Sequence, residues 1–341
     1  MHKLSNSVIR IPDSKCPFVA WKMDGGESGD VNAEWLKFRS TGIGGSDVAA
    51  IMGISEYRSP LEVWLEKTGR AESPDLSKKE SVEWGNRLES IIRDKFREEH
   101  PELKVMQFNA SLVSKERPWA HANLDGRVQD ENGNWGILEI KTAGKARESD
   151  WKNGVPDYYL TQVTHYLSVT GWSFAYVAAL IGGQHYVEYR IDRDEDDVKA
   201  ISEAVDNFWH GFVETGLMPE IVGMPSESRA LFALNPMGDG SQQVTEEAAT
   251  DLFNSLVWDY TQAAQQEKLA KESKDAAAAR LRMIIGSNKS VSSDIYRVSW
   301  SRYPKSRIDQ KRLKEERPDI YEKFKVTTQA DGGLHISEIG K

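Results

Sequence analysis

Apolar residues recur at helical spacing through most of the first hundred positions. This pattern predicts a short helix over residues 34–39 and a longer helix over residues 81–100. A capping serine followed by a proline predicts another helix start at Ser59 and Pro60, and Gly69 is expected to end that helix. The apolar stripe expected on the longer helix consists of Trp84, Leu88, Ile91, Ile92 and Phe96.

Apolar and polar residues then begin to alternate, which is typical of strands. The alternation predicts strands over residues 104–113, 122–129 and 135–142. The segment Asn132-Gly133-Asn134 lies between two of these apolar runs and predicts a hairpin turn. We therefore expect the last two strands to pair with each other.

Further elements follow the third strand in an order that indicates the fold class. The pattern predicts a helix over about residues 157–169, a hairpin over residues 172–191 that turns at Gly182-Gly183, and a helix over residues 194–215. Helices, then a meander, a helix, more strands and a helix predict an α/β fold with a mixed central sheet flanked by helices.

Prolines, glycines and serines gather between residues 218 and 240 and predict a domain boundary. We expect a first domain over residues 1–218, a linker over residues 219–244, and a C-terminal extension over residues 245–341.

One long helix is predicted at the start of the extension, over residues 245–285, with apolar positions near a seven-residue repeat. At roughly 1.5 Å per residue it spans about 60 Å, too long to pack fully on one small core. We expect it to meet a partner helix or another subunit. A strand over residues 295–303, a short helix over residues 308–316 and a last strand over residues 334–339 complete a small basic α/β extension.

Composition indicates the cellular compartment of the protein. The only cysteine, Cys16, excludes an internal disulfide framework and a cysteine-rich zinc site, which fits a reducing cytosol. No apolar run approaches the roughly 18 residues of a membrane span, and the first thirty positions do not form a secretory signal. We expect a soluble, cytoplasmic protein that does not bind a membrane.

The net charge of −9 argues against a protein that coats DNA by bulk attraction. Charge is distributed unevenly, because residues 280–325 contain 13 Lys and Arg against 6 Asp and Glu, a net of +7. A basic module on an acidic body suits local contact with a polyanion, and a solvated charged face is the alternative explanation.

Two acidic residues and one lysine are expected to converge on the predicted meander. Alternation in the strand 135–142 places Glu139 and Lys141 on one face and Ile140 on the other. Asp125, on the partner strand, can come beside Glu139 in a site that collects negative charge. A divalent hard cation with oxygen ligands stabilises such a site, and Lys141 is left to position water or to meet charge on a phosphate.

The spacing Asp-x13-Glu-x-Lys resembles the core of the PD-(D/E)XK nucleases. Glu-x-Lys alone is a weak signal, since the chain contains two more copies, at Glu102 and at Glu272. The copy at Glu139 has the context of strand, turn and strand with an aspartate before it. A solvated charge pair on an edge strand is the alternative.

Two helical residues could share this site. Glu89 lies one position off the apolar stripe of its helix, so it could bind a metal as a third acid, or form an ion pair with Arg87 or Arg93. Gln162 lies on the helix that follows the Glu139 strand, and a neutral amide can hold an attacking water without adding charge.

A different chemistry is expected at the glycine-rich loop of residues 41–47. Its backbone N–H groups can converge, Ser46 lies at a helix N-terminus that attracts anions, and Arg39 could grip a phosphate. The loop lacks the lysine of a Walker A motif, which disfavours binding of a nucleoside triphosphate. A plain glycine-rich turn with a serine cap is the alternative.

Five motifs together resemble the YqaJ-type viral recombinase family, to which phage lambda exonuclease is related. They occur in the expected order between about residues 31 and 215. The motifs are Trp35 with Arg39-Ser40-Thr41-Gly42-Ile43-Gly44-Gly45-Ser46-Asp47, Trp84-Gly85 with Leu88-Glu89, Leu124-Asp125-Gly126, Leu138-Glu139-Ile140-Lys141-Thr142, and Gln162-Val163-Thr164-His165-Tyr166.

The resemblance implies a PD-(D/E)XK nuclease fold and a Mg²⁺-dependent 5′→3′ exonuclease that leaves 3′ overhangs on linear duplex DNA for recombination. It implies two Mg²⁺ ions, with Mn²⁺ as a substitute. Asp125, Glu139 and the Ile140 carbonyl correspond to metal ligands, and Lys141 to the catalytic lysine.

The resemblance also assigns the remaining candidates. Glu89 corresponds to a helper at the second metal and Gln162 to a helper at the water, while Arg39 and Ser46 correspond to a pocket for the terminal 5′-phosphate. A ring of three chains and a single-strand annealing protein as partner are implied by kinship. For the extension we expect either subunit contacts or DNA contact, and the candidate DNA-binding residues are Arg297, Arg302, Lys305 and Arg307.

Two rival functions stay open at this point. The first is an endonuclease on the same fold, either a restriction enzyme or a structure-specific one. The second is a non-catalytic scaffold that binds DNA ends or recombination proteins, although a scaffold has no need for the set of two acids and a lysine.

Overall fold

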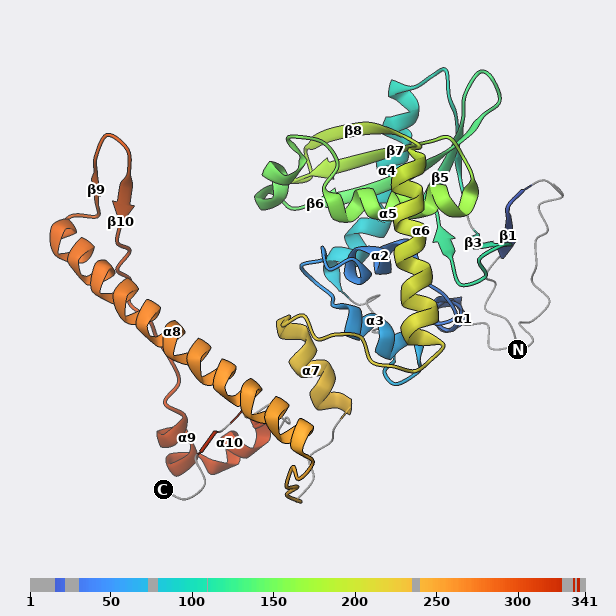
Figure 1. Ribbon diagram of the computed structural model, residues 1–341. Helices are drawn as coiled ribbons and strands as arrows, with labels where there is room; N and C mark the ends of the chain where they lie inside the picture. Colours follow the sequence, from blue (N-terminus) through green and yellow to red (C-terminus); the bar gives the residue numbers. More distant parts are fainter. Residues whose placement is uncertain are drawn as a thin grey trace. The chain divides into compact units, whose positions relative to one another are not determined.

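A five-stranded mixed sheet forms the centre of the first of two units, Met1–Pro236 and Met237–Lys341, into which the chain divides (Figure 1). The computed structural model describes residues 16–21, 31–72, 79–108, 110–234, 240–326, 334 and 336–337 of the 341. The strands lie in the order β2-β5-β6-β7-β8, so that β6 is central. Their bounds are β2 (Lys104–Gln107), β5 (Gly126–Gln129), β6 (Trp135–Ala143), β7 (Phe174–Ile181) and β8 (His185–Asp192).

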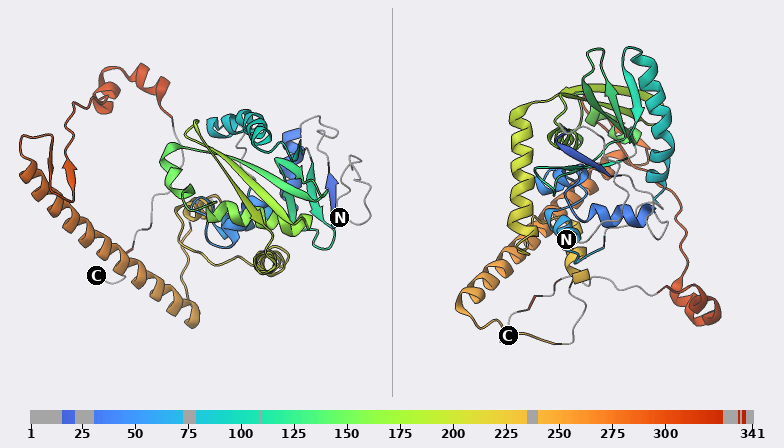
Figure 2. Two further views of the ribbon diagram at one scale, coloured as in Figure 1. Left: turned by 90° about the horizontal axis from the view of Figure 1, so that it is seen from above. Right: turned by 90° about the vertical axis from the view of Figure 1, so that its right-hand side faces the viewer.

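Both faces of this sheet are covered by helices, which Figure 2 shows from two further directions. Ile137 on β6 faces α5 (Asp157–Thr170) and packs with its residues Val163 and Leu167. Leu138 and Ile140 face the opposite way, toward α4 (Glu80–Glu99). The predicted alternation along this strand is confirmed, as is the α/β class with a mixed central sheet flanked by helices.

Chain direction follows from the connections. β6 and β7 are parallel and are joined through α5, whereas the other neighbouring pairs of the sheet are antiparallel. The hairpin of β7 and β8 turns at Gly182 and Gly183, which both have positive φ, as predicted. Glycine is required there because other residues rarely adopt this backbone conformation.

A second, three-stranded sheet corrects two of the predicted strands. It consists of β1 (Phe18–Trp21), β3 (Ser111–Ser114) and β4 (His121–Asn123). The predicted strand 104–113 therefore splits into β2 and β3, and the predicted strand 122–129 into β4 and β5. Buried and partly exposed residues alternate from Ala122 to Gln129, across the break between β4 and β5, so the pattern alone does not mark that break.

Helices form a second apolar cluster beside the sheets. It includes Ile43, Val48 of α2 (Gly45–Ile51), Trp64 of α3 (Pro60–Lys67) and Val205 of α6 (Glu195–Phe208). The predicted start of α3 is confirmed by a reciprocal cap, in which Ser59 N donates to Glu62 Oε2 at 2.9 Å and Glu62 N donates to Ser59 Oγ at 3.3 Å.

Three further helical predictions need qualification. The helix predicted over residues 34–39 is the end of α1 (Val31–Arg39), and the helix predicted over residues 194–215 is α6 followed by a π-turn, η3 (Trp209–Val213). On α4, Ile92 and Phe96 are buried as predicted, but Trp84 and Ile91 are exposed. The buried stripe of α4 is narrower than expected because only one side of the helix meets the sheet.

The segment predicted as a linker, residues 219–244, contains the helix α7 (Pro225–Leu234). Leu231 and Leu234 pack against the second apolar cluster, so this part of the segment belongs to the first unit. Pro225 begins this helix, and a proline at a helix start gives the same local signal as one in an irregular segment.

The second unit begins with α8 (Glu247–Ile285), a helix of 39 residues that confirms the predicted long helix. The hairpin of β9 (Ser290–Ser292) and β10 (Arg297–Ser299) follows, and the predicted strand 295–303 shortens to β10. The predicted helix 308–316 is α9 (Gln310–Glu316), and α10 (Pro318–Phe324) was not expected. The predicted strand 334–339 lies largely outside the described residues. No helix in the described part of the chain is long and apolar enough to span a membrane.

Two buried histidines join the layers of the first unit. Nε2 of His165, on α5, donates to the carbonyl oxygens of Ile43 (3.2 Å) and His121 (3.0 Å), and Nε2 of His121 donates to Pro118 O (3.1 Å). The Nδ1 atoms of both rings are buried without a hydrogen-bond partner. Burial lowers the pKa of each histidine to about 4, so both rings are neutral near pH 7.

We predict a loss of stability on acidification that depends on these rings. Each histidine has a lower pKa in the folded state than when unfolded, so its contribution is complete above about pH 6.5 and is lost as the pH falls toward 4. The free energy of unfolding should fall in that window by about 1.4 kcal/mol per pH unit for each histidine. Urea denaturation at a series of pH values measures this slope.

The variant His165→Gln keeps an N–H donor but cannot titrate. The slope of its unfolding free energy against pH should therefore be smaller by the contribution of one histidine, about 1.4 kcal/mol per pH unit. The matched control is His185→Gln, at a histidine whose side chain is 54% exposed. Equal slopes in the two variants would contradict the assignment of a buried neutral ring at position 165.

Candidate functional site

The acidic pair lies where β5 and β6 stop pairing. Gly126, the first residue of β5, pairs with Leu138, so Asp125 comes beside Glu139. Beyond this pair, the Asp125 carboxylate replaces the backbone hydrogen bonds between the strands, because its Oδ2 accepts a hydrogen bond of 2.8 Å from Ile140 N. The Asp125 side chain and the Ile140 main chain are thereby held together on the central strand.

Glu139 lies on the α5 side of the sheet, and only 2% of it is exposed. Its Oε1 accepts hydrogen bonds from Lys141 Nζ at 2.6 Å and from Gln162 Nε2 at 2.8 Å. Gln162 Nε2 also donates to Tyr166 Oη at 3.0 Å. The other oxygen of Glu139, Oε2, is buried and has no hydrogen-bond partner. Four residues from β6 and α5 thus converge on one point.

Burial of two neighbouring carboxyl groups, those of Asp125 and Glu139, determines the pKa values at this point. Burial raises the pKa of Glu139 to about 8, and the charge of Asp125 adds to this effect while Lys141 opposes it. Burial also raises the pKa of Asp125. Burial alone lowers the pKa of Lys141, but the charges of Glu139 and Asp125 outweigh it and raise that pKa above its ordinary value. Lys141 is therefore an ammonium, and the centre has room for further positive charge.

Glu89, on α4, lies close to the same centre but is held in an ion pair with Arg93. Burial and then the charge of Asp125 raise the pKa of Glu89. Arg93 also donates to Asp125 O at 3.1 Å, which ties the helix to the start of β5. Arg93 is one of the two partners that the sequence offered for Glu89; the other, Arg87, pairs with Glu83.

The donor set fits a hard divalent cation. Asp125 and Glu139 supply carboxylate oxygens, and the unpartnered Oε2 of Glu139 is the kind of buried oxygen that a cation would satisfy. Among the described residues, no group of three or more His, Cys, Asp and Glu side chains is arranged to hold a metal. In this arrangement the site therefore offers two acidic side chains, and Glu89 would have to leave Arg93 to become a third.

Arg39 and Ser46, the predicted anion pocket, are adjacent. Arg39 Nη2 donates to Ser46 Oγ at 3.0 Å, and Ser46 is exposed on the first turn of α2. Arg39 also contacts two buried carboxylates, Asp47 (3.1 Å) and Glu66 (3.3 Å). The structure thus places both predicted residues at one point, within an ion-pair cluster that the sequence did not predict.

That cluster has two further cations, Arg58 and Lys67. Arg58 forms ion pairs with Asp47 and Glu66, and Lys67 Nζ lies 2.9 Å from Asp47 Oδ2. Burial alone would raise the pKa of Asp47, but Lys67, Arg58 and Arg39 hold it well below its ordinary value. Three cations against two anions leave a surplus of one positive charge.

The sequence contains no signal for Arg58 and Lys67 as members of this cluster. Arg58 precedes the cap of α3, and Lys67 is in the last turn of that helix, where basic residues are common for reasons of helix polarity. Only the packing of α1, α2 and α3 brings them to Arg39. We call Arg39, Asp47, Arg58, Glu66 and Lys67 the cation-rich cluster.

Gly45 connects this cluster to the acidic centre. It is the first residue of α2, next to Ser46, and it packs directly on α5. A Cβ atom at Gly45 would lie 2.5 Å from Tyr166 Cε1 and 2.7 Å from Gln162 Cγ. Gln162 and Tyr166 are the residues that surround Glu139, so a glycine is needed for the two charged centres to come this close.

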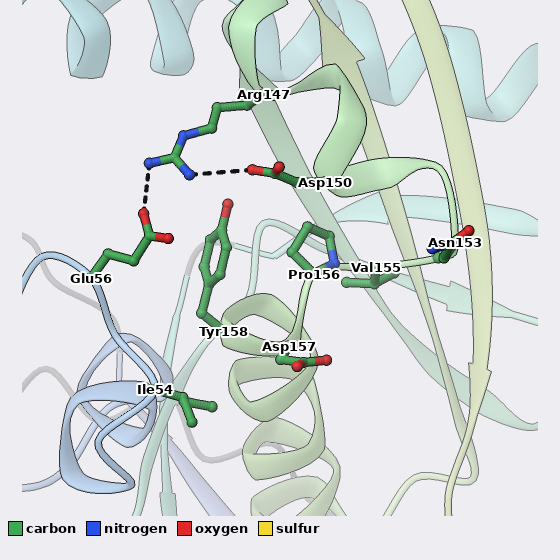
Figure 3. Close-up of a pocket in the computed structure, with 10 residues that line it drawn as sticks. Ile54, Glu56, Arg147, Asp150, Asn153, Val155, Pro156, Asp157 and Tyr158 are labelled. Atoms are coloured by element: carbon green, nitrogen blue, oxygen red, sulfur yellow. Dashed lines mark hydrogen bonds and ion pairs between the residues drawn. The ribbon is translucent and has the colours of Figure 1, made fainter. Parts of the chain in front are cut away.

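A groove of about 380 Å³ lies between the loop after α2 and the start of α5. In Figure 3, Arg147 reaches from η2 (Lys145–Trp151), a 3-10 turn after β6, to Glu56 and Asp150. Arg147 Nη2 lies 2.7 Å from both Glu56 Oε2 and Tyr57 Oη. These contacts join the loop that carries Arg58 to the segment that follows Lys141.

The predicted DNA-binding residues of the second unit are all exposed. Arg302 lies over the Trp300 ring, 3.9 Å from its centroid, and donates to Gly286 O at the end of α8. Arg297 donates to Ser292 Oγ across the hairpin at 3.0 Å. Lys305 and Arg307 lie in the segment between β10 and α9. Their role stays a prediction.

Comparisons with known proteins agree on one family. A family model described as the YqaJ-like viral recombinase domain matches residues 34–173, the range that contains every residue of both charged centres. YqaJ of Bacillus subtilis (strain 168), an uncharacterized protein, is 31% identical over 309 residues, which cover 86% of this chain and 91% of that protein.

Solved structures similar to this chain include two exonucleases. An alkaline exonuclease (LHK-Exo) from Laribacter hongkongensis is 19% identical with a TM-score of 0.44, and the match covers 60% of this chain and 100% of that one. A phage related exonuclease from Haemophilus somnus 129PT is 12% identical with a TM-score of 0.35, and the match covers 52% and 96% of the two chains.

We predict that Gly45→Ala destabilises the first unit. The added methyl group has no space beside Tyr166 and Gln162, and such overpacking costs about 1–3 kcal/mol of unfolding free energy. Gly44→Ala is the control, because a Cβ at Gly44 would have its nearest neighbour at 3.9 Å and the φ of −93° suits alanine. Urea denaturation compares the two variants, and equal stability would contradict the close approach of α2 and α5.

Proposed function

The chain belongs to the YqaJ-like viral recombinase family, and from this premise we propose that it is a metal-dependent deoxyribonuclease. It digests one strand of linear double-stranded DNA in the 5′→3′ direction and leaves a 3′ single-stranded overhang for recombination. The observation that carries the proposal is the convergence of Asp125, Glu139, Lys141 and Gln162 at the end of the β5–β6 pairing.

This arrangement supports a PD-(D/E)XK core for the first unit. Such a core needs an aspartate at the head of one strand, and a glutamate and a lysine two residues apart on its antiparallel neighbour. Asp125 precedes β5, while Glu139 and Lys141 lie on β6. The antiparallel pair brings together residues that are 14 positions apart in the sequence. β6 is the central strand of the sheet, so Glu139 and Lys141 are not a solvated charge pair on an edge strand.

Asp125, Glu139 and the Ile140 carbonyl would hold Mg²⁺, or Mn²⁺ in its place, and Glu89 would reach a second ion. Bound Mg²⁺ would supply Lewis acidity to the phosphodiester and would acidify the attacking water. The unpartnered Oε2 of Glu139 and its raised pKa both favour a cation at this point, because a positive charge there stabilises the carboxylate form.

Lys141 and Gln162 act on the reacting groups in this proposal. The Lys141 ammonium, whose pKa the acidic pair raises, offsets the negative charge that develops on the phosphate during in-line attack. Its Nζ is kept in place by Glu139 Oε1 and lies 4.8 Å from the centroid of the Tyr159 ring. The Gln162 amide, fixed between Glu139 and Tyr166, orients the water without adding charge.

The cation-rich cluster is the proposed site for the terminal 5′-phosphate. Arg39 and Ser46 can both contact a phosphate at the N-terminal turn of α2, and the cluster has a surplus positive charge. Water attack at phosphorus breaks the bond to the 3′ oxygen, so the released nucleotide gains a 3′ hydroxyl and the shortened strand gains a new 5′-phosphate. Each cleavage thus regenerates the group that this pocket would bind.

The proposal includes partners that follow from kinship. A ring of three chains around the duplex would allow an acidic protein to hold DNA in a basic channel. A single-strand annealing protein would receive the 3′ overhang. Arg297, Arg302, Lys305 and Arg307 would give the second unit a local contact with the phosphate backbone.

We predict that Asp125→Ala and Glu139→Ala abolish Mg²⁺-dependent digestion of linear duplex DNA. Each removes a carboxylate from the centre, and the rate should fall by at least about a thousandfold, or roughly 4 kcal/mol of transition-state stabilisation. Release of nucleotides from duplexes labelled at one end measures the rate. Chelation of the metal should stop the wild-type enzyme in the same assay.

Asp125→Asn is an informative control, because its carbonyl oxygen can keep the hydrogen bond from Ile140 N while the charge is lost. It should fold like the wild type and remain inactive. Full activity in either alanine variant would refute the assignment of the acidic pair. Cleavage of covalently closed circular DNA would favour an endonuclease instead.

We predict that Ser46→Ala and Arg39→Lys reduce the preference for 5′-phosphorylated ends. Each removes a hydrogen bond to the phosphate, and one charge-assisted hydrogen bond is worth about 1.5–3 kcal/mol, so the preference should fall about tenfold or more. The ratio of initial rates on phosphorylated and 5′-hydroxyl duplexes measures it.

The control is Ser40→Ala, since Ser40 Oγ donates to Lys37 O outside the cation-rich cluster. Its ratio should equal that of the wild type. Equal rates of the wild-type enzyme on the two kinds of end would refute the phosphate pocket and would leave the nuclease proposal standing.

A further inference from the structure

The helix α8 carries a set of large apolar side chains that the described residues of this chain leave exposed. Nine of them are exposed, and five of these lie on one stripe: Phe253, Leu256, Tyr260, Leu281 and Ile284, which are between 43% and 66% exposed. The other four, Leu252, Trp258, Leu269 and Met283, lie off this stripe. The hairpin β9–β10 follows the end of the helix, where Ile285 is buried. The helix is about 58 Å long, and its exposed apolar stripe would gain free energy by packing against another surface.

The stripe has the spacing of a coiled coil. From Phe253 onward, steps of three and four residues alternate through the helix without interruption. The positions are Phe253, Leu256, Tyr260, Ala263, Glu267, Ala270, Lys274, Ala277, Leu281 and Ile284. Large apolar residues occupy the two ends of this seam, and small or charged residues occupy its middle.

The seam is symmetric about its midpoint, between Lys268 and Leu269. When a second copy runs in the opposite direction, each seam residue meets a seam residue of that copy. The layers are Phe253 with Ile284, Leu256 with Leu281, Tyr260 with Ala277, Ala263 with Lys274, and Glu267 with Ala270. Large residues pair at the ends, the tyrosine faces an alanine, and each charged residue faces an alanine that leaves space for its head group to reach water.

The distribution of charge along α8 also favours an antiparallel arrangement of the two helices. Residues 247–261 contain three acidic residues and no basic ones, whereas residues 276–285 contain two arginines and no acidic residues. An antiparallel pair brings the acidic end of one helix to the basic end of the other, and a parallel pair would bring like charges together. Asp259 and Arg280 flank the seam on the same side, so an antiparallel pair places Asp259 beside Arg280 of the second copy.

We propose that α8 is a self-association surface, on which a second copy of this chain binds as an antiparallel coiled coil. The seam is filled by the same residues from both copies, so the interface is two-fold symmetric. It uses residues of the second unit alone and does not depend on the nuclease proposal.

Charge reversal in the full-length chain tests the proposal. Asp259→Arg and Arg280→Asp should each weaken self-association by about tenfold, because each places like charges together twice in the pair. An equimolar mixture of the two variants should associate as tightly as the wild type, since every contact then joins opposite charges. Sedimentation equilibrium measures the dissociation constants.

The matched control is Glu272→Arg, which makes the same change of charge on the outer side of the helix. Its dissociation constant should equal that of the wild type. Circular dichroism of each variant checks that α8 remains helical. Failure of the mixture to recover the wild-type affinity would overturn the antiparallel pairing.

Disulfide trapping tests direction independently. In a Cys16→Ser background, chains with Leu256→Cys and chains with Leu281→Cys should crosslink when mixed, and neither should crosslink alone. The two Leu256 positions of an antiparallel pair lie about 37 Å apart. Self-crosslinking of the Leu256→Cys chain would show a parallel pair, and a full-length chain that stays monomeric at micromolar concentration would refute self-association; either result overturns the proposal.

Discussion

The burial of the Glu139 carboxylate in the central sheet is the constraint on which the site depends. A charge in that place is costly unless other groups compensate for it. Lys141 and Gln162 satisfy Oε1, and nothing among the described residues satisfies Oε2. The nearby charge of Asp125 makes the cost larger. The arrangement is therefore poor as a source of stability and well suited to a bound cation, which is why the acidic pair supports a metal-dependent function.

Two sets of contacts fix the positions of the residues around Glu139. The Asp125 carboxylate ends the β5–β6 ladder by accepting from Ile140 N, so its position is fixed by the backbone of the central strand. Gln162 is fixed by the packing of α5 against the sheet and against Gly45. Because Gly45 adjoins Ser46, the same contact fixes the distance between the acidic centre and the cation-rich cluster. The fold thus positions two sites of opposite charge through one helix contact.

The sequence predicted those parts of the fold that depend on local patterns. The side-chain alternation of β6, the cap at Ser59, the hairpin at Gly182 and the long helix α8 each follow from a short stretch of residues. It did not predict the break between β4 and β5, because buried and partly exposed residues go on alternating across it. It also did not predict Arg58 and Lys67 beside Asp47, since only the packing of three helices brings them together. The meeting of Asp125 and Glu139 was predictable because strand pairing itself determines which residues meet, whereas Gln162 reaches Glu139 through the packing of α5.

The contact at Gly45 also limits how relatives of this chain can change. A hydrogen atom is the only side chain that fits between α2 and α5, where Tyr166 and Gln162 leave no space for a methyl group. A larger residue at position 45 would be tolerated only together with smaller residues on α5, and those same residues surround Glu139. A substitution at position 45 is therefore coupled to the side chains at positions 162 and 166, and through them to the surroundings of Glu139.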